Sequence, residues 1–287
     1  MENDWLEALI ALPEQLFYNT GIATYVWVLT NRKAPDRKDK VQLINATTFW
    51  TQMRRSLGNK RREIPGERAQ QIVLLLGDFK ESEFSKIYQT TYFGYRKITV
   101  ERPLKLNFQL SAERIARLDD EPGFKKIATS AKKKEEQRLK EIAAGVERQQ
   151  TIKEFLTELS DTTKAKSYLN REDFRSVIKE AAKSSKLSLD VSEMKAVINA
   201  LSERDESAEP CGDSRGEIES DPELRDTENV PLEQSIVDYF EREVRPYVSD
   251  AWINESVRDH KDGEIGKIGY EINFNRSTVI SHRVSSK

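Results

Sequence analysis

Cations, rather than nucleophiles, are the side chains of this sequence whose types and spacing suggest chemistry. Five of them fall within nine residues: Arg54, Arg55, Lys60, Arg61 and Arg62. Like charges at this density repel one another unless counter-charges or a polyanion neutralise them. The cluster is therefore a candidate phosphate contact, and structural pairing with Glu63 and Glu67 is the alternative. The sequence leaves both interpretations open.

A second candidate is the pair Arg96 and Lys97, which stand beside Tyr92, Phe93 and Tyr95. Cations interleaved with aromatic rings are typical of contacts to single strands or flipped bases, because the rings stack on bases while the cations hold the backbone. Packing of the aromatic rings in a core is the alternative. The segment AKKKEEQRLKEI is also basic, but its opposite charges at helical spacing indicate a solvated helix face.

Other site chemistries find little support. Cys211 is the single cysteine, so neither an intramolecular disulfide nor a thiolate metal cluster can form. His260 and His282 lack partners at metal-ligand spacing. The glycines of GEIGKIG lack the spacing of a dinucleotide loop and are interpreted as easing a turn into the strand YEINF.

Charge divides unevenly along the 287 residues, although the net charge is only -2. Residues 1–110 carry 17 Lys/Arg against 12 Asp/Glu, whereas residues 202–232 carry 3 against 11. A basic front half permits nucleic-acid contact, and an acidic stretch without aromatic residues is typical of a mobile linker. No apolar run approaches the roughly 18 residues of a membrane span. We expect a cytoplasmic protein that makes no membrane contact.

The elements that would position these side chains are read from periodicity. Strands are predicted at 7–12, 25–29 and 41–44, and a strand pair at 92–109 broken at Pro103. Helices are predicted at 49–57, with Gly58-Asn59 as a C-cap, and at 66–76, 124–148, 150–160, 171–183, 190–201 and 230–244. Three strands in the first 45 residues cannot close a sheet around a core, which suggests the end of a larger sheet.

Several long motifs support that interpretation: LPEQLFYNTGIATYVWVLTNRK, KVQLINA, MRRSLGNKRREI, FGYRKITVERPLKLNFQ, RDTENVPLEQSIVDYFEREVRPYVSDAWINES and KIGYEINFNR. In this order they closely resemble the modification (M) subunit of type I restriction-modification systems. Members of that family are N6-adenine DNA methyltransferases that use S-adenosylmethionine. The resemblance covers about residues 1–110 and 225–276.

The resemblance implies an α/β fragment, made of the last strands of a Rossmann-like methyltransferase sheet, followed by a mostly α-helical C-terminal region. It places the loop at Phe17, Tyr18 and Asn19 on the target-base side of the catalytic domain. It also implies DNA, the specificity (S) subunit and the restriction (R) subunit as partners. The expected segments are methyltransferase strands at 1–50, a basic helix and strand segment at 51–110, a helical region at 111–201, an acidic linker at 202–229 and a helix and strand module at 230–287.

Two departures from the family limit what the resemblance implies. The glycine-containing cofactor loop is absent. The catalytic Asn-Pro-Pro-Phe motif is absent too, since no two of the nine prolines are adjacent. The end of the chain, INFNR followed by STVISHRVSSK, also departs from the family. We therefore expect the C-terminal part of an M subunit that binds no S-adenosylmethionine and does not methylate alone. A stand-alone helical module that binds nucleic acid or protein is the alternative.

Overall fold

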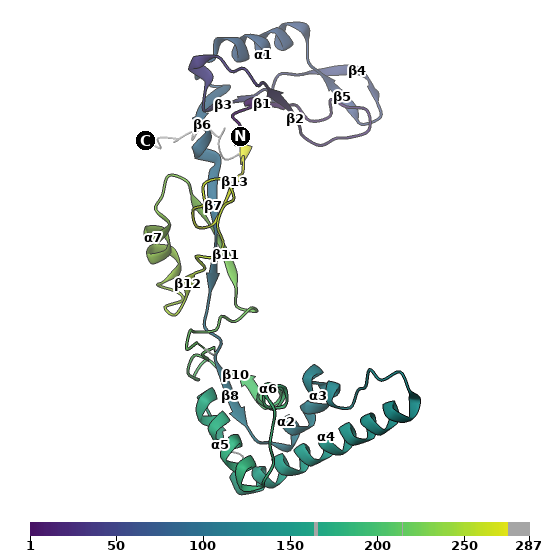
Figure 1. Cartoon of the computed structure of the whole chain (residues 1–287). Coiled ribbons are helices and arrows are strands. Elements are labelled where there is room, and N and C mark those ends of the chain that lie inside the picture. Colours follow the sequence, from purple (N-terminus) through teal and green to yellow (C-terminus); the bar gives the residue numbers. More distant parts are fainter. Residues whose placement is uncertain (164–165, 214, 275–287) are drawn as a thin grey trace, which may run out of the picture. The chain divides into compact units, whose positions relative to one another are not determined.

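A computed structural model describes residues 1–163, 166–213 and 215–274 and shows a mixed α/β structure (Figure 1). The chain divides into two compact units. The first contains Met1–Val100, Asp226–Ser249 and Ile253–Lys287, and the second contains Glu101–Arg225 and Asp250–Trp252. In sequence, the second unit is thus inserted into the first.

The first unit opens with a four-stranded sheet of order β2-β1-β3-β6. Its strands are β1 (Leu6–Leu12), β2 (Thr24–Leu29), β3 (Lys40–Asn45) and β6 (Ser85–Gln89). β1 and β3 are parallel, and the other neighbours are antiparallel. The three strands predicted from the sequence are confirmed, since each overlaps β1, β2 or β3.

The near-continuous apolar sequence of β1 follows from its central position, which buries both faces. On one face Ile10 and Ile44 pack with partly buried residues such as Ile72 of α1 (Gly66–Asp78), the predicted helix. On the other face Leu9 and Leu43 pack with Phe93. β2 lies at the edge of the sheet, and its large apolar side chains stay exposed.

The helix predicted at 49–57 is wrong: these residues lead into the hairpin of β4 (Thr51–Leu57) and β5 (Lys60–Glu63). Gly58 has a φ of 59° in the two-residue loop between Leu57 and Lys60. Both a helix C-cap and a tight hairpin loop favour glycine with positive φ, so this signal fits either structure. Phe49 packs in the core with Ile10 and Ile44, and the Trp50 ring lies against Arg62. Met53 and Leu57 then remain, which would give a helix at 51–57 too little apolar surface to pack.

A second sheet of the first unit is built on β7 (Gly94–Glu101). β7 pairs with β11 (Asp226–Pro231), β12 (Trp252–Ile253) and β13 (Lys267–Tyr270). Gly263 and Gly266 have φ values of 72° and 83° in the predicted turn before β13. The strand that follows contains Gly269 and ends at Tyr270, so the strand predicted at YEINF is wrong. The helix expected at 230–244 begins only after β11, as α7 (Ile236–Tyr239) and a π-helical turn, η4 (Phe240–Val244).

The second unit packs helices around a small sheet of order β10-β8-β9. Its strands are β8 (Leu106–Gln109), β9 (Ser167–Tyr168) and β10 (Ser202–Arg204). Its helices are α2 (Ala112–Ala116), α3 (Pro122–Ile127), α4 (Glu135–Thr163), α5 (Arg171–Ser184) and α6 (Val191–Ala200). Short 3-10 turns complete the described elements: η1 (Pro35–Arg37), η2 (Thr90–Phe93) and η3 (Arg117–Asp120).

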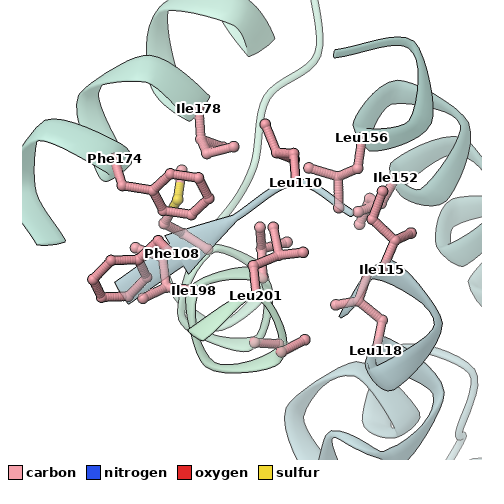
Figure 2. Close-up of a cluster of buried hydrophobic side chains, with 14 of the residues drawn as sticks. Phe108, Leu110, Ile115, Leu118, Ile152, Leu156, Phe174, Ile178, Ile198 and Leu201 are labelled. Atoms are coloured by element: carbon pink, nitrogen blue, oxygen red, sulfur yellow. The ribbon is translucent and has the colours of Figure 1, made fainter. Parts of the chain in front are cut away.

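The core of this unit is assembled from helices on opposite sides of β8 (Figure 2). Phe108 of β8 stacks on Phe174 of α5 with ring centroids 5.2 Å apart. Ile152 and Leu156 of α4 reach the same cluster. β7 and β8 are thus the two strands predicted at 92–109, but they belong to different sheets and do not pair with each other.

The predicted helix 124–148 is wrong in its first part, because α3 ends at Ile127 and α4 begins only at Glu135. From there one helix continues through the segment predicted at 150–160, because no breaker separates 148 from 150. Its first turns are charged and fully exposed, as expected of a solvated face, and only its second half contributes large side chains to the core. Within the described residues, no helix is both long and apolar enough to cross a membrane.

The acidic residues 202–229 do not have the structure of an extended linker. Ala208 and Cys211 are buried, and Asp221 is 1% exposed. The Arg204 Nε lies 2.7 Å from Asp221, and Arg171 pairs with Glu219 at 2.8 Å. The hydrogen bonds from Arg204 lower the pKa of the Asp221 carboxyl below its ordinary value. One of these arginines belongs to the segment itself and the other to α5, and composition alone does not reveal such pairing.

Replacing Gly145 of α4 by Ala should destabilise the protein, although Ala is the better helix former by about 1 kcal/mol. A Cβ at this position would lie 2.7 Å from the Cα of Ala128, and such overpacking costs roughly 1–3 kcal/mol. Gly77→Ala in α1 is the matched control, because nothing lies within 4 Å of its Cβ position. Urea unfolding followed by circular dichroism measures both. A Gly145→Ala protein of unchanged or higher stability would contradict the close approach of α3 and α4.

Candidate nucleic-acid interface

The loop between β1 and β2 carries the first exposed aromatic residues of the candidate site. Pro13 is buried and ends β1, and a bridge between Phe17 and Thr20 closes a tight turn. Phe17 is 46% exposed and Tyr18 is 61% exposed. Asn19, the next residue of the turn, is exposed as well. Large aromatic rings in solvent are free to stack on another molecule, because they are not packed in a hydrophobic core.

The β4–β5 hairpin is fixed to this loop by backbone hydrogen bonds (Figure 1 labels both strands). The Asn59 N–H donates to the Tyr18 carbonyl oxygen at 3.1 Å. The N–H groups of Arg61 and Arg62 donate to the Gln15 carbonyl oxygen at 3.0 and 3.2 Å. The cations and the aromatic loop, which are about 40 residues apart in sequence, therefore belong to one surface.

The five cations of the hairpin remain available for a ligand. Arg54, Arg55 and Arg61 are exposed, and Lys60 and Arg62 are half-buried. In the described part of the chain none of them forms an ion pair, so the alternative of pairing with Glu63 and Glu67 is not seen. The Arg62 guanidinium lies 3.9 Å from the centroid of the Trp50 ring, which restrains one cation without neutralising it.

Arg96 and Lys97 lie in a different sheet from the hairpin, on β7. Arg96 is held by Asp262, with nitrogen–oxygen distances of 2.5 and 3.4 Å. This hydrogen bond raises the pKa of Arg96 and lowers that of Asp262. Arg96 is thus already paired, whereas Lys97 is exposed.

The aromatic residues near Arg96 differ in exposure: Phe93 is buried, Tyr95 is half-buried and Tyr92 is 53% exposed. Phe93 is 4% exposed and belongs to the core of the first sheet. Tyr92 stacks on Tyr88 with ring centroids 4.5 Å apart, and Tyr95 lies against Gly269. The alternative of core packing is confirmed for Phe93, and the structure does not join this segment to the hairpin in one site.

Three residues of the hairpin surface are not singled out by the sequence. Trp50 holds Arg62, Gln15 accepts two hairpin amides, and Arg68 of α1 lies 5.3 Å from the Phe49 ring centroid. Trp50 carries a weak signal, since an aromatic residue beside a dense cationic run is a candidate cation–π partner. Gln15 carries none, because only its backbone takes part.

The described residues do not fit S-adenosylmethionine. Such cofactors bind beyond the carboxyl ends of parallel strands, on a glycine-rich turn. Here the parallel strands β1 and β3 lead into Pro13 and Ala46 instead. A hollow of about 380 Å³ beside β2 is lined by residues that include Trp27 and Phe274, with no carboxylate to bind ribose hydroxyls.

A metal centre is not found either. Among the residues described, no three His, Cys, Asp or Glu side chains are placed to hold a metal ion. His260 is exposed and lies 3.8 Å from Asp259, and His282 lies outside the described residues. The surface of the loop and the hairpin therefore offers binding through cations and rings, without metal or nucleophile chemistry.

Comparison with known proteins assigns a class to the front of the chain. Residues 1–116, which include β1–β8, match the family model described as N-6 DNA Methylase. This segment contains the aromatic loop and the basic hairpin. The front of the chain is thus similar to DNA N6-methylases, in agreement with the motifs in the sequence.

Two proteins similar to parts of the chain are subunits of type I enzymes. A segment of 47 residues is 45% identical to the type I restriction enzyme MjaVII methylase subunit of Methanocaldococcus jannaschii and covers 16% of this chain and 8% of that protein. The crystal structure of the type I restriction-modification system methyltransferase subunit from Streptococcus thermophilus matches at 18% identity and a TM-score of 0.27, over 31% of this chain and 17% of that one. The chain thus matches less than a fifth of either relative's length, and the resemblance to type I modification subunits is confirmed for this part.

Gly58→Ala should loosen the hairpin from the aromatic loop. An Ala at φ 59° is strained by about 1 kcal/mol, and its Cβ would lie 3.0 Å from the Tyr18 carbonyl oxygen. Opening of the hairpin should then become roughly fivefold more frequent, as measured by the rate of tryptic cleavage at its arginines. Gly21→Ala, with nothing within 4 Å, should leave that rate unchanged. Equal cleavage rates in the two variants would show that the tight loop does not hold the hairpin.

Proposed function

We propose that this chain forms a DNA-contacting part of a type I restriction-modification adenine methyltransferase (M) subunit. In this proposal the β4–β5 hairpin grips the phosphate backbone through Arg54, Arg55, Lys60, Arg61 and Arg62. Phe17, Tyr18 and Asn19 face the target base. Lys97 adds a cation on β7, and Arg96 can do so only by giving up Asp262. The single observation that carries the proposal is the backbone bonding that joins the aromatic loop to a hairpin of unpaired cations.

The chemistry of the surface supports DNA over an acidic protein. Phosphate contacts need accessible cations that no internal carboxylate neutralises. The hairpin supplies five without an ion pair among the described residues, three of them exposed and two half-buried. Contacts to an extruded base need aromatic faces that are free to stack, and Phe17 and Tyr18 supply them. A two-stranded β-ribbon is also one of the shapes that a duplex major groove admits.

The edge of the first sheet supports a role within a larger assembly. β2 leaves Trp27 58% exposed and Leu29 64% exposed, beside an edge with unpaired backbone groups. Such an edge favours association with another strand or subunit. We propose that the chain works with the specificity (S) subunit, and with the restriction (R) subunit in the full complex. In this view the four-stranded sheet forms the last strands of a Rossmann-like methyltransferase sheet.

Methyl transfer by this chain alone is not part of the proposal. Discrimination of a flipped adenine uses the Asn side chain and a Pro carbonyl of the family's Asn-Pro-Pro-Phe motif, which this sequence lacks. We propose that the S-adenosylmethionine pocket of the assembly is formed by residues other than these.

A stand-alone nucleic-acid- or protein-binding module is the second candidate function. One observation favours it: the helical unit has its own buried core, from Phe108 to Cys211, and does not need the first sheet to complete it. Such a module would bind its ligand without the aromatic loop and the hairpin. The experiment below therefore also distinguishes the two functions.

Alanine at Arg54, Arg55, Lys60, Arg61 and Arg62 together should weaken binding of the full chain to a fluorescein-labelled DNA duplex. The slope of log binding constant against log salt should become shallower by about 0.9 for each cation that contacts phosphate. Fluorescence anisotropy across a salt series measures both effects.

The chain provides a control of equal charge, because another nine residues also carry five cations, all of them exposed: Lys132, Lys133, Lys134, Arg138 and Lys140. Their alanine variant should keep the affinity and the salt slope, because Glu135, Glu136 and Glu141 lower the local charge. If the control loses binding while the hairpin variant retains it, the helical-module function replaces the proposed one.

A further inference from the structure

An open groove in the second unit lies between α5 and the segment that leads into α6. Its volume is about 450 Å³. Its apolar lining includes Ala182, Leu187, Leu189, Val191 and Met194. Val191 is 83% exposed, so an apolar side chain stands in solvent at the edge of the groove. The groove is separate from the loop and hairpin surface, because it belongs to the other unit.

The wall of the groove is held in place by a dense set of bonds. Asp190 and Glu193 form a capping box, with hydrogen bonds of 2.8 and 2.9 Å, at the start of α6. Arg148 of α4 binds Glu193 at 2.7 Å and also donates to the Ser188 carbonyl oxygen. The Leu187 N–H donates to the Ala182 carbonyl oxygen at 2.8 Å. A groove built this way is present before any ligand arrives, which lowers the cost of binding.

Three cations line the α5 side of the groove at every fourth residue, so they lie on one face of the helix. Arg175, Lys179 and Lys183 are four residues apart, so they form a stripe of about 12 Å along the helix. The adjacent stripe, Phe174, Ile178 and Ala182, is buried in the core. Lys179 and Lys183 are exposed and form no ion pair with a described carboxylate.

The carboxylate that lines the groove is already engaged. Asp190 is the acidic residue of the lining, and its side chain accepts the Glu193 N–H as the cap of α6. Glu172 lies 3.5 Å from Arg175. The groove therefore combines an apolar floor with a cationic rim that has little internal compensation.

We propose that this groove docks an acidic amphipathic helix of a partner protein. A helix that places leucine-like side chains on the floor can set carboxylates at every fourth position against Arg175, Lys179 and Lys183. The apolar floor disfavours nucleic acid, whose backbone is charged along its whole length. This surface goes beyond the proposed DNA contact, because it lies in the other unit and recognises a protein helix through an apolar floor as well as through cations.

The test uses the full chain and a fluorescein-labelled peptide of about 18 residues, long enough to hold a helix. The peptide carries leucines along one face and glutamates beside them at every fourth position. Lys179→Glu with Lys183→Glu should weaken its binding about tenfold in fluorescence anisotropy, through two reversed charge contacts. Val191→Ser should weaken it as well, since it removes apolar contact at an exposed site that folding does not need.

Lys133→Glu with Lys140→Glu is the matched control, with the same charge change on exposed residues outside the groove. It should bind the peptide as the wild type does, and a peptide of scrambled order should bind neither protein. The proposal is overturned if the scrambled peptide binds as tightly as the designed one. It is also overturned if the control variant and the groove variant, Lys179→Glu with Lys183→Glu, lose the same amount of peptide affinity. It is also overturned if Lys179→Glu with Lys183→Glu abolishes binding of a DNA duplex and leaves peptide binding intact. The alanine variant of the hairpin tests the proposed DNA contact alone, because its effect on DNA binding does not involve the groove.

Discussion

Backbone hydrogen bonds between the β4–β5 hairpin and the loop after β1 are the interaction on which the candidate site depends. They join the carbonyl oxygens of Gln15 and Tyr18 to amides of Asn59, Arg61 and Arg62. The hairpin has little else to hold it, because nearly all of its side chains are exposed or half-buried. A two-stranded hairpin is marginally stable alone. With these bonds, the sheet of β1 and β3 fixes both the aromatic residues and the cations.

Charged side chains have two different roles in this structure. In the segment 202–229, acidic residues are paired with arginines, as Asp221 with Arg204 and Glu219 with Arg171. On the hairpin the cations lack such partners in the described part of the chain, and Trp50 restrains only Arg62. Paired charges help to define one packed structure, whereas unpaired cations on an exposed ribbon leave their electrostatic attraction for a ligand. The net charge of -2 reveals neither arrangement.

Much of the fold follows from the sequence where burial is continuous. The strands around 7–12 and 41–44 are predictable because β1 and β3 bury nearly every residue. The hairpin of β4 and β5 is not predictable in this way, because Gly58 suits a helix C-cap as well as a tight loop. The packed structure of 202–229 escapes prediction because composition does not show which arginine each carboxylate pairs with, whether Arg204 of the same segment or Arg171 of α5. The cationic cluster is visible as composition, but its link to Tyr18 runs through backbone atoms, which no side-chain pattern encodes.

Hydrogen–deuterium exchange of the full chain, with and without a DNA duplex, tests the central claim most directly. If the loop and the hairpin form one DNA-facing surface, DNA should slow exchange in peptides covering 15–20 and 54–63 together. Peptides covering 132–140 should exchange at unchanged rates. Protection of the hairpin without the loop would contradict a joint surface, and protection confined to the helical unit would contradict the site altogether.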